Sequence, residues 1–309
     1  MKRLLRPILA PVQRRVVNHL LNNFAYWQAR GVHVVPVHFY QPIPDTRTLG
    51  EGPWAKRSEM PGVRINEERQ LELLARFSAD YKDEYEGFPR ERGGEPHRYF
   101  VRNGAFETVD GEILYCMVRH FRPRKIFEVG SGNTTYLSAQ AALRNAAEGA
   151  PACELVAFEP YPNEVLLAGF PGLTRLVAAR AQDIPFETFD ELGDGDILFI
   201  DSSHVLKIGS DVQYLYLEVL PRLRKGVIVH VHDIFLPGEY PRKWVMEQNT
   251  FWNEQYLLQA FLAFNDAFEI QWAGSHMHLR HPEKLKAAFS SYYDSETQWP
   301  GSFWMRKTA

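Results

Sequence analysis

The sequence predicts an α/β fold built on a mainly parallel sheet with helices on both faces. Short apolar runs alternate with stretches of helical periodicity through the C-terminal two thirds of the chain. These runs lie near residues 125–129, 153–158, 174–177, 196–200 and 226–231. Polar residues follow directly after several of them. Because ligands bind outside the carboxyl ends of strands in open parallel sheets, we expect the functional residues there.

The chain has 309 residues, which is long enough for one large α/β domain with an extension. We divide it into an N-terminal extension, residues 1–104, and a main domain, residues 105–309. The net charge of −3 and the mixing of both signs argue against a nucleic-acid partner. The two cysteines, Cys116 and Cys153, lie in apolar runs and predict buried thiols in a reducing, cytoplasmic compartment.

Residues 1–44 contain several basic residues and no acid, and their apolar residues recur at helical spacing. This pattern predicts a basic amphipathic helix. We favour a helix that packs on its own domain or on a sister subunit, and we therefore expect a homo-oligomer. Peripheral contact with a membrane surface is the alternative. Residues 31–44 are interrupted by prolines and predict an edge strand or an extended strap.

Two further helices are expected before the first strand of the main domain. Asn66 precedes Glu67 and Glu68, which suit the first turn of a helix because its dipole favours acids there. A second amphipathic helix is expected over 109–121, ending before Pro123.

The first strand of the main domain, residues 125–129, runs into a Gly-X-Gly turn and then a helix. We expect Gly130 and Gly132 to allow tight, partly positive-φ geometry and close approach of a ligand. The helix start offers free N–H groups to a carboxylate or phosphate. A dinucleotide fingerprint would need a third glycine where Thr135 stands, so a pyrophosphate is disfavoured. Glu128 would place a carboxylate at the mouth of the strand, which suits an ammonium or hydroxyl group.

Two more acids follow predicted strands. Glu159 could accept both hydroxyls of a ribose, a role found with several classes of nucleoside cofactor. Asp201 ends a strongly apolar strand, where a carboxylate is costly unless a cation faces it. A sulfonium, an ammonium or a divalent metal ion would each meet that need.

In order and kind, the segments 128–133, 158–160 and 196–201 resemble the class I S-adenosylmethionine-dependent methyltransferases. The segments 201–204 and 229–237 are similar to a bacterial branch near the macrocin and catechol O-methyltransferases. The resemblance covers about residues 105–309. It implies a Rossmann-like, doubly wound, seven-stranded sheet whose last strand, near 301–306, is antiparallel. It also implies S-adenosylmethionine as cofactor, bound by Glu128, Gly130, Ser131, Gly132, Asn133, Thr134, Glu159, Gln182, Asp183 and Asp201.

In that branch, acids from these strand ends hold a magnesium ion that orients a substrate hydroxyl. The corresponding metal candidates here are Asp201 and Asp233, and His232 takes the place of one acid. A histidine favours manganese, zinc or no metal over magnesium. Without a metal, His232 is the first candidate for a general base, with Asp233 orienting it and His204 as the second candidate.

His230 and the three histidines between 276 and 281 are not predicted to belong to the site. His230 lies on the same strand as His232 and is expected to be buried. His276, His278 and His281 have suggestive spacing but lack partners for a zinc site.

The loop 235–241 and the polar and aromatic residues after it are expected to cover the strand ends. Those residues are Trp244, Trp252, Asn253, Glu254 and Tyr256. They suit a sugar or another polyhydroxylated ligand, although a lid packed on its own helix is the alternative. The predicted function is O-methylation of a small molecule or glycan. The alternatives are a non-catalytic S-adenosylmethionine-binding protein, an NAD-dependent oxidoreductase and a membrane-surface adaptor.

Overall fold

The sheet has seven strands in the part of the chain that the structure describes. This computed structural model describes residues 6–294 and 298–309, with side chains from residue 14 onward. The strands are β1 (Lys125–Val129), β2 (Glu154–Phe158), β3 (Arg175–Val177), β4 (Ile197–Ile200), β5 (Ile228–Val231), β6 (Phe268–Ala273) and β7 (Phe303–Lys307). Their order is β3-β2-β1-β4-β5-β7-β6, and β7 runs antiparallel to both neighbours. The predicted Rossmann-like sheet with an antiparallel last strand is confirmed.

Strand β6 has no counterpart among the apolar runs singled out in the sequence. Its residues alternate between apolar Phe268, Ile270 and Trp272 and polar Glu269 and Gln271. Such alternation is a strand signal, but the run is short and follows a helix closely. β6 pairs only with β7 among the described strands, so it forms one edge of the sheet.

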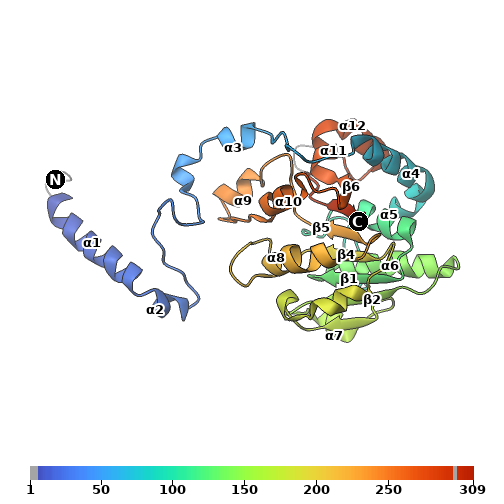
Figure 1. Cartoon of the computed structure of the whole chain (residues 1–309), viewed down its shortest axis with the longest axis horizontal. Helices are drawn as coiled ribbons and strands as arrows, with labels where there is room; N and C mark the ends of the chain where they lie inside the picture. The colour runs from blue at the N-terminus through green and yellow to red at the C-terminus, as the bar shows by residue number, and fades with distance from the viewer. Residues whose placement is uncertain (1–5, 295–297) are drawn as a thin grey trace.

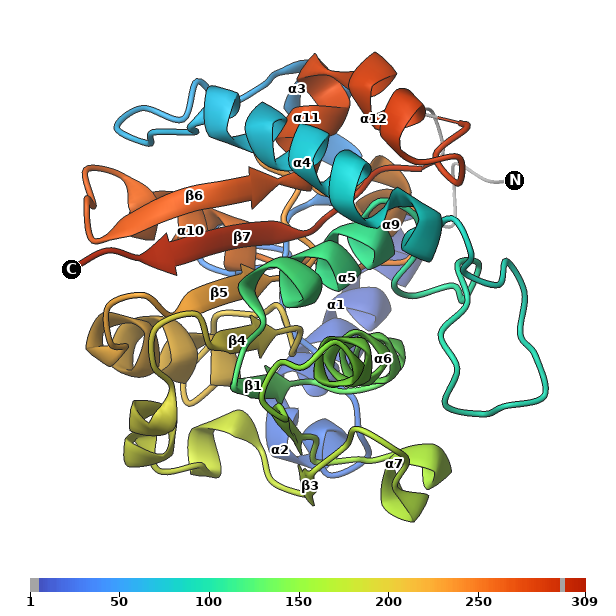
Figure 2. The same cartoon turned by 90° about the vertical axis from the view of Figure 1, so that its right-hand side faces the viewer.

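Helices cover both faces of the sheet, and each face has its own apolar core. Strand residues alternate between the two cores: Ile126 packs into one and Phe127 into the other. Helices α4 (Glu67–Tyr85), α5 (Asp110–Phe121) and α6 (Asn133–Ala147) lie over one face (Figure 2). The other helices of the main body are α7 (Glu164–Ala168), α8 (Asp211–Tyr214), α9 (Arg242–Met246), α10 (Glu254–Leu262), α11 (Gly274–Arg280) and α12 (Pro282–Ala288).

Helix α4 lies before residue 104 but packs with the helices that follow it. Leu73, Leu74 and Phe77 are buried in the same apolar core as α5 and strand β1. The expected helices at 67 and 109 are therefore both present, and packing is continuous across residue 104. Whether residues 1–104 and 105–309 are separate folding units stays a prediction.

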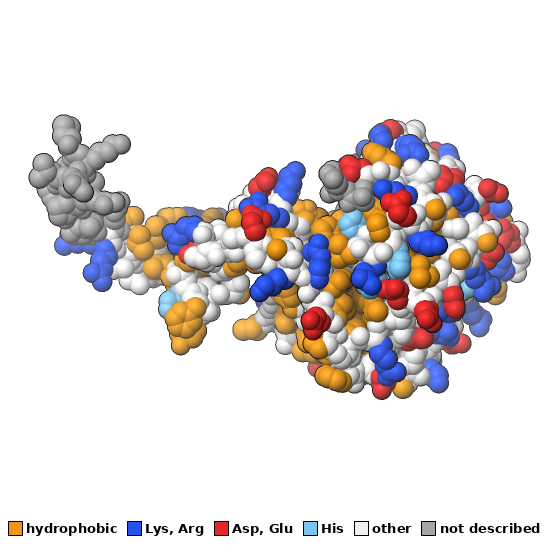
Figure 3. All heavy atoms as spheres, turned by 90° about the horizontal axis from the view of Figure 1, so that it is seen from above, with side chains coloured by type: hydrophobic (Ala, Val, Ile, Leu, Met, Phe, Trp, Pro, Cys, Tyr) orange, Lys and Arg blue, Asp and Glu red, His pale blue; other side chains and the backbone are white. Residues whose placement is uncertain are grey.

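Residues 6–44 form an arm that extends away from the sheet and its helices (Figure 1). The arm contains α1 (Arg6–Asn22), α2 (Phe24–Gln28) and an extended segment without a strand. Its exposed hydrophobic side chains (Figure 3) are Val16, Val17, Phe24, Tyr26, Val32, Val37, Phe39, Tyr40 and Ile43. The expectation that this helix packs on its own domain is thus wrong for the described side chains. A sister subunit and a membrane surface stay predictions.

A strap, residues 45–66, connects the arm to α4 and crosses the loop 235–241. It includes the short helix α3 (Gly52–Ala55). The Trp54 indole N–H donates to the carbonyl of Tyr240 at 2.9 Å, and the Ser58 N–H donates to the carbonyl of Pro237 at 2.8 Å. Among the described helices, none is long and apolar enough to cross a membrane.

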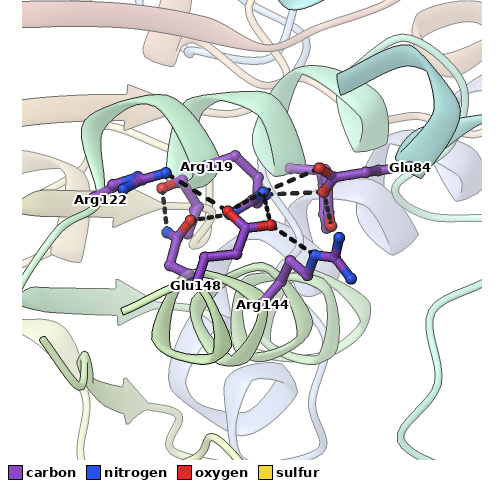
Figure 4. Close-up of polar contacts among 8 residues, drawn as sticks. Glu84, Arg119, Arg122, Arg144 and Glu148 are labelled. Carbon is purple, nitrogen blue, oxygen red and sulfur yellow. Dashed lines mark hydrogen bonds and ion pairs between the residues drawn. The ribbon is translucent and has the colours of Figure 1, made fainter. Parts of the chain in front are cut away.

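A buried arginine joins α4, α5 and α6 (Figure 4). The Arg119 side chain is 2% exposed and donates to Glu84 on α4 at 2.9 Å and to Glu148 after α6 at 2.8 Å. It also donates to the amide oxygen of Asn145. Arg144 approaches Glu148 from the solvent side at 2.9 Å. Glu148 follows α6 whereas the glycine turn precedes it, so Arg119 ties α4, α5 and α6 together at the end that lies away from the turn.

Replacing Arg119 with Met should lower the free energy of unfolding by about 3 kcal/mol, because two partly buried carboxylates lose their cation. Arg144→Met is the matched control and should cost less than about 1 kcal/mol, because its pair is exposed. Chemical denaturation of both variants measures the difference. Equal losses would contradict the assigned role of Arg119.

Candidate functional site

The two glycines of the turn after β1 have different roles. Gly130 has a φ of +83°, and a Cβ at this position would overlap the carbonyl oxygen of Asp201. It therefore permits β1 and β4 to end in close contact. The backbone of Gly132 is extended, with a φ of 173°, so the expected positive φ occurs at Gly130 alone. A Cβ at Gly132 would meet nothing within 4 Å, so this position leaves room beside the turn.

Glu128 lies beneath the turn and not at its mouth. It is fully buried, and its Oε1 accepts hydrogen bonds from the hydroxyls of Thr134 and Thr135, the latter at 3.0 Å. Burial raises the pKa of Glu128 to about 8. Its Oε2 and the hydroxyl of Ser131 are buried without a partner. Buried polar atoms are normally paired, so these two atoms fit a polar ligand such as an amino-acid group.

The predicted ribose and adenine contacts lie further along the strand ends. The Glu159 carboxylate is half-buried and accepts from the N–H groups of Ser131 at 3.2 Å and Tyr161 at 2.8 Å. Asp183 is exposed and pairs with Arg180 at 2.7 Å. Gln182 donates to the carbonyl of Gly209 at 3.2 Å. An adenine at this place would have to share Asp183 with Arg180.

The start of α6 also contacts the segment before α5. Asn133 donates to the Asn103 side chain at 3.2 Å, and Asn103 in turn accepts from the N–H groups of Ala105 and Phe106. Thr134 is buried against Glu128. Asn133 and Thr134 therefore hold the turn in place.

Four residues beyond β4 and β5 form what we call the histidine–carboxylate cluster: Asp201, His204, Asp233 and Glu254. The His204 Nε2 lies 3.3 Å from Asp201 Oδ1 and 3.6 Å from Asp233 Oδ2. Its Nδ1 lies 2.9 Å from Glu254 Oε2. One ligand atom from each of Asp201, His204 and Asp233 lies within 4.8 Å of the others, as in groups that hold a metal ion.

Two members of the cluster have left-handed backbone. The φ angles are 58° for His204 and 55° for Asp233. This conformation is unfavourable for residues with a side chain and persists where surrounding contacts impose it. The carbonyl of His204 accepts from the N–H groups of Asn253 and Glu254 at 3.1 and 3.2 Å. The start of α10 thus holds both the backbone and the ring of His204.

His232 is buried at the end of β5, beside the cluster. Its Nε2 lies 3.6 Å from Asp233 Oδ1, and its Nδ1 has no partner. The His232 ring packs against the Phe106 ring, with 4.7 Å between the ring centroids. Asp110 also acts on His232 electrostatically, while its own carboxylate accepts from the N–H groups of Gly301 and Ser302 at 2.9 Å.

Acids and histidines in this region shift one another's pKa values. Burial opposes the charged form of His204, but Asp201 and Glu254 outweigh it and raise its pKa well above the ordinary value. Burial likewise opposes charge on His232, yet Asp233, Asp201 and Asp110 raise its pKa. Burial alone would raise the pKa of Asp201, but His232 and His204 hold it below the ordinary value. For Asp233, Glu254 and Asp110, burial is the larger effect and raises the pKa of each carboxyl although the histidines oppose it.

The other histidines lie apart from the cluster. His230 packs between Phe199 and Trp304, and burial lowers its pKa well below the ordinary value. His276 and His281 both pair with Glu67, at 2.8 and 3.1 Å. His278 contacts the hydroxyl of Tyr292 at 2.7 Å. Within the described residues these histidines form no metal-ligand group.

A cavity of about 810 Å³, which we call the strand-end cavity, opens over the cluster. Its lining includes the acids and histidine at the strand ends, Asp110, Asp201, His232 and Asp233, and the tryptophans Trp244, Trp252 and Trp299. Arg242, Lys243 and Glu107 also line it. The Trp252 ring packs on His204 at 4.3 Å, so one wall of the cavity is in contact with the cluster.

Three of the residues expected to contact a substrate have other positions. Asn253 accepts from the N–H of Leu206 at 2.6 Å, and the Tyr256 hydroxyl donates to Glu239 at 2.6 Å. Glu254 lies behind His204 with 1% of its side chain exposed. Of the five residues predicted after the loop, Trp244 and Trp252 line the cavity.

Sequence reasoning missed Asp110 and the pairing of Glu254 with His204. Asp110 lies in the first turn of α5, where acids are common, so its position alone could not distinguish it. Glu254 lies 50 residues after His204, and no spacing rule connects them. Both roles depend on how the chain folds back over the ends of the strands.

Part of the chain matches a known protein family. Residues 127–234, about a third of the chain, match the model of a family described as a methyltransferase domain. This match confirms the resemblance to S-adenosylmethionine-dependent methyltransferases for the segment that contains the glycine turn, Asp201 and Asp233. An uncharacterised protein of Archaeoglobus fulgidus is 28% identical over 169 residues, which cover 52% of this chain and 75% of the relative.

Two solved structures are similar at low identity. A candidate methyltransferase from Thermobifida fusca has 16% identity and a TM-score of 0.41, covering 82% of this chain and 97% of its own. The apo structure of CmcI-N160 has 15% identity and a TM-score of 0.38, and the match covers 74% of this chain and 84% of that one. Similarity at this level carries no information about the substrate of the present protein.

The two glycines of the turn allow a matched test. Gly130→Ala should lower the free energy of unfolding by at least about 2 kcal/mol, because of its positive φ and its contact with Asp201. Gly132→Ala should leave stability unchanged but weaken binding of S-adenosylhomocysteine, because its methyl group enters the open space beside the turn. Thermal unfolding and calorimetric titration measure the two effects. Unchanged ligand affinity in Gly132→Ala would place the cofactor elsewhere.

Proposed function

We propose that the protein methylates a hydroxyl group of a small molecule or glycan, because residues 127–234 match the model of a methyltransferase domain. The observation that carries this proposal is the position of Asp201. The carbonyl oxygen of Asp201 lies against Gly130 of the glycine turn. Asp201 also lines the strand-end cavity. A cofactor on the turn and an acceptor in the cavity would therefore meet at Asp201.

The residues around the turn suit the parts of S-adenosylmethionine. The unpartnered oxygen atoms of Glu128 and Ser131 would bind its amino-acid end, and the space beside Gly132 would admit it. Glu159 would accept the ribose hydroxyls. Gln182 and Asp183 would contact the adenine, with Asp183 leaving or sharing Arg180.

The reaction itself is an in-line displacement at the methyl carbon. The acceptor oxygen forms a bond to the methyl carbon while the carbon–sulfur bond breaks, and S-adenosylhomocysteine leaves with the electron pair. The hydroxyl proton passes to His232, which must first lose its own proton despite the raised pKa that its acidic neighbours impose. Asp233, 3.6 Å from His232, would hold the resulting imidazolium.

A divalent metal ion is compatible with this arrangement. Asp201, His204 and Asp233 would hold it, since their ligand atoms converge. Such an ion would lower the pKa of an acceptor hydroxyl by stabilising its anion. Asp201 and Asp233 line the strand-end cavity, so an acceptor in the cavity would lie within reach.

The walls of the cavity favour a ring-shaped acceptor. Trp244 and Trp252 contribute aromatic surface to the cavity, whereas the Trp299 ring is stacked on His278 and approached by Arg57. Arg242, Lys243 and Glu107 add polar groups. Sugars and other polyhydroxylated rings bind by stacking on aromatic surface together with hydrogen bonds to a few polar groups.

Calorimetric titration with S-adenosylhomocysteine and with NAD tests the cofactor. S-adenosylhomocysteine should bind with a dissociation constant in the micromolar range or below, and NAD should not bind, because the third glycine of a dinucleotide turn is replaced by Thr135. Binding of NAD alone would replace the proposed reaction with hydride transfer.

A His232→Ala variant tests the chemical step. Release of S-adenosylhomocysteine should be followed with a panel of phenolic and glycosidic acceptors, and the rate with the best acceptor should fall about 10²- to 10⁴-fold. Affinity for S-adenosylhomocysteine should stay within about twofold of the wild type. His97→Ala, outside the strand-end cavity, should keep the wild-type rate. An unchanged rate in His232→Ala would remove the general-base assignment.

A further inference from the structure

Glu254 forms a buried hydrogen bond to His204. The two side chains are 1% and 7% exposed, and Glu254 Oε2 lies 2.9 Å from His204 Nδ1. Because a carboxylate can only accept, the Nδ1 of the ring carries the proton in this pair. The other ring nitrogen, Nε2, is then directed toward Asp201 and Asp233.

The distances from Nε2 to the two carboxylates are a few tenths of an ångström longer than those between neighbouring ligands of one small metal ion. Ligands about 2.1 Å from an ion and at right angles to each other lie about 3.0 Å apart. Nε2 lies 3.3 Å from Asp201 Oδ1 and 3.6 Å from Asp233 Oδ2. A shift of a few tenths of an ångström would close this group around an ion.

Several contacts prevent the His204 ring from turning away. The Trp252 ring packs against it at 4.3 Å. The left-handed backbone of His204 is held by N–H groups of Asn253 and Glu254. Metal-ligating histidines commonly donate their second N–H to a carboxylate in this way, which fixes the ring and strengthens the ligand.

We propose that Glu254 is a positioning residue that presents His204, with Asp201 and Asp233, to a divalent transition-metal ion such as Mn²⁺, in preference to Mg²⁺. The donor set explains the preference. Mg²⁺ favours oxygen ligands, whereas an imidazole nitrogen increases affinity for first-row transition metals. His232 stands beside this site with an unpartnered Nδ1 and adds no oxygen ligand.

This inference extends the proposed function, because the ion would lie where the acceptor hydroxyl is expected. Its test, however, needs neither cofactor nor acceptor. The full-length protein, stripped with a chelator, is titrated with MnCl₂ and with MgCl₂ by calorimetry, and bound Mn²⁺ is followed by electron paramagnetic resonance. Loss of methyl transfer alone would leave the metal-binding result unaffected.

We expect the wild-type protein to bind Mn²⁺ at least about tenfold more tightly than Mg²⁺. Glu254→Ala should weaken Mn²⁺ binding about 10- to 100-fold, and Glu254→Gln, which can still accept the ring proton, should weaken it less. His204→Gln replaces the ring nitrogen with an amide oxygen and should reduce the preference for Mn²⁺ over Mg²⁺ by about tenfold or more. Glu67→Gln is the matched control, because Glu67 pairs with His276 at 2.8 Å outside the cavity.

Thermal unfolding shows which variants are folded before they are titrated. If Glu254→Ala does not fold, Glu254→Gln and His204→Gln decide the question. Equal affinity of the wild type for the two ions would overturn the proposal. Wild-type Mn²⁺ affinity in Glu254→Gln together with an unchanged ion preference in His204→Gln would overturn it as well.

Discussion

The site depends on one electrostatic constraint: several carboxylates are held away from water at the ends of two neighbouring strands. Asp201, Asp233 and Glu254 are mostly or fully buried, and Asp110 lies close enough to act on the same histidine. Buried negative charge is costly unless cations and hydrogen bonds compensate it. His204 and His232 are the basic groups that face these acids, at 2.9 to 3.6 Å. A ligand that binds here must therefore leave these contacts between acids and histidines in place or replace some of them.

Several elements of the fold position these acids and the groups that contact them. Strands β4 and β5 bring Asp201 and Asp233 together, while the start of α10 supplies Glu254 and holds the backbone of His204. The N–H groups of Gly301 and Ser302, just before β7, bind Asp110. Gly130 in turn lets the glycine turn lie against Asp201. The glycine turn, the histidine–carboxylate cluster and the strand-end cavity are thus parts of one packed unit.

Much of this arrangement could be predicted from the sequence because it is local. A strand followed by Gly130-Ser-Gly132 and a helix is readable in one stretch, and acids at strand ends follow from the geometry of parallel sheets. The orientation of Glu128 was not readable, because it depends on Thr134 and Thr135 folding back over it. The partner of His204 was not readable either, because Glu254 reaches it from a separate helix. Amphipathicity likewise indicated the helices of the arm but not their extension away from the body, since it shows an apolar face without showing what covers it.

The insertion of β7 between β5 and β6 has a consequence for how the chain reaches its native state. Ile228 of β5 pairs with Arg306 of β7, so this part of the sheet forms only by closing a long loop of chain. Contacts of large sequence separation form slowly, because the entropy of loop closure is lost before the contacts compensate for it. The N–H groups that hold Asp110 belong to the segment entering β7. We therefore expect Asp110 and the neighbouring histidine–carboxylate cluster to be among the last regions to become ordered during refolding, after β1 and α6 have formed.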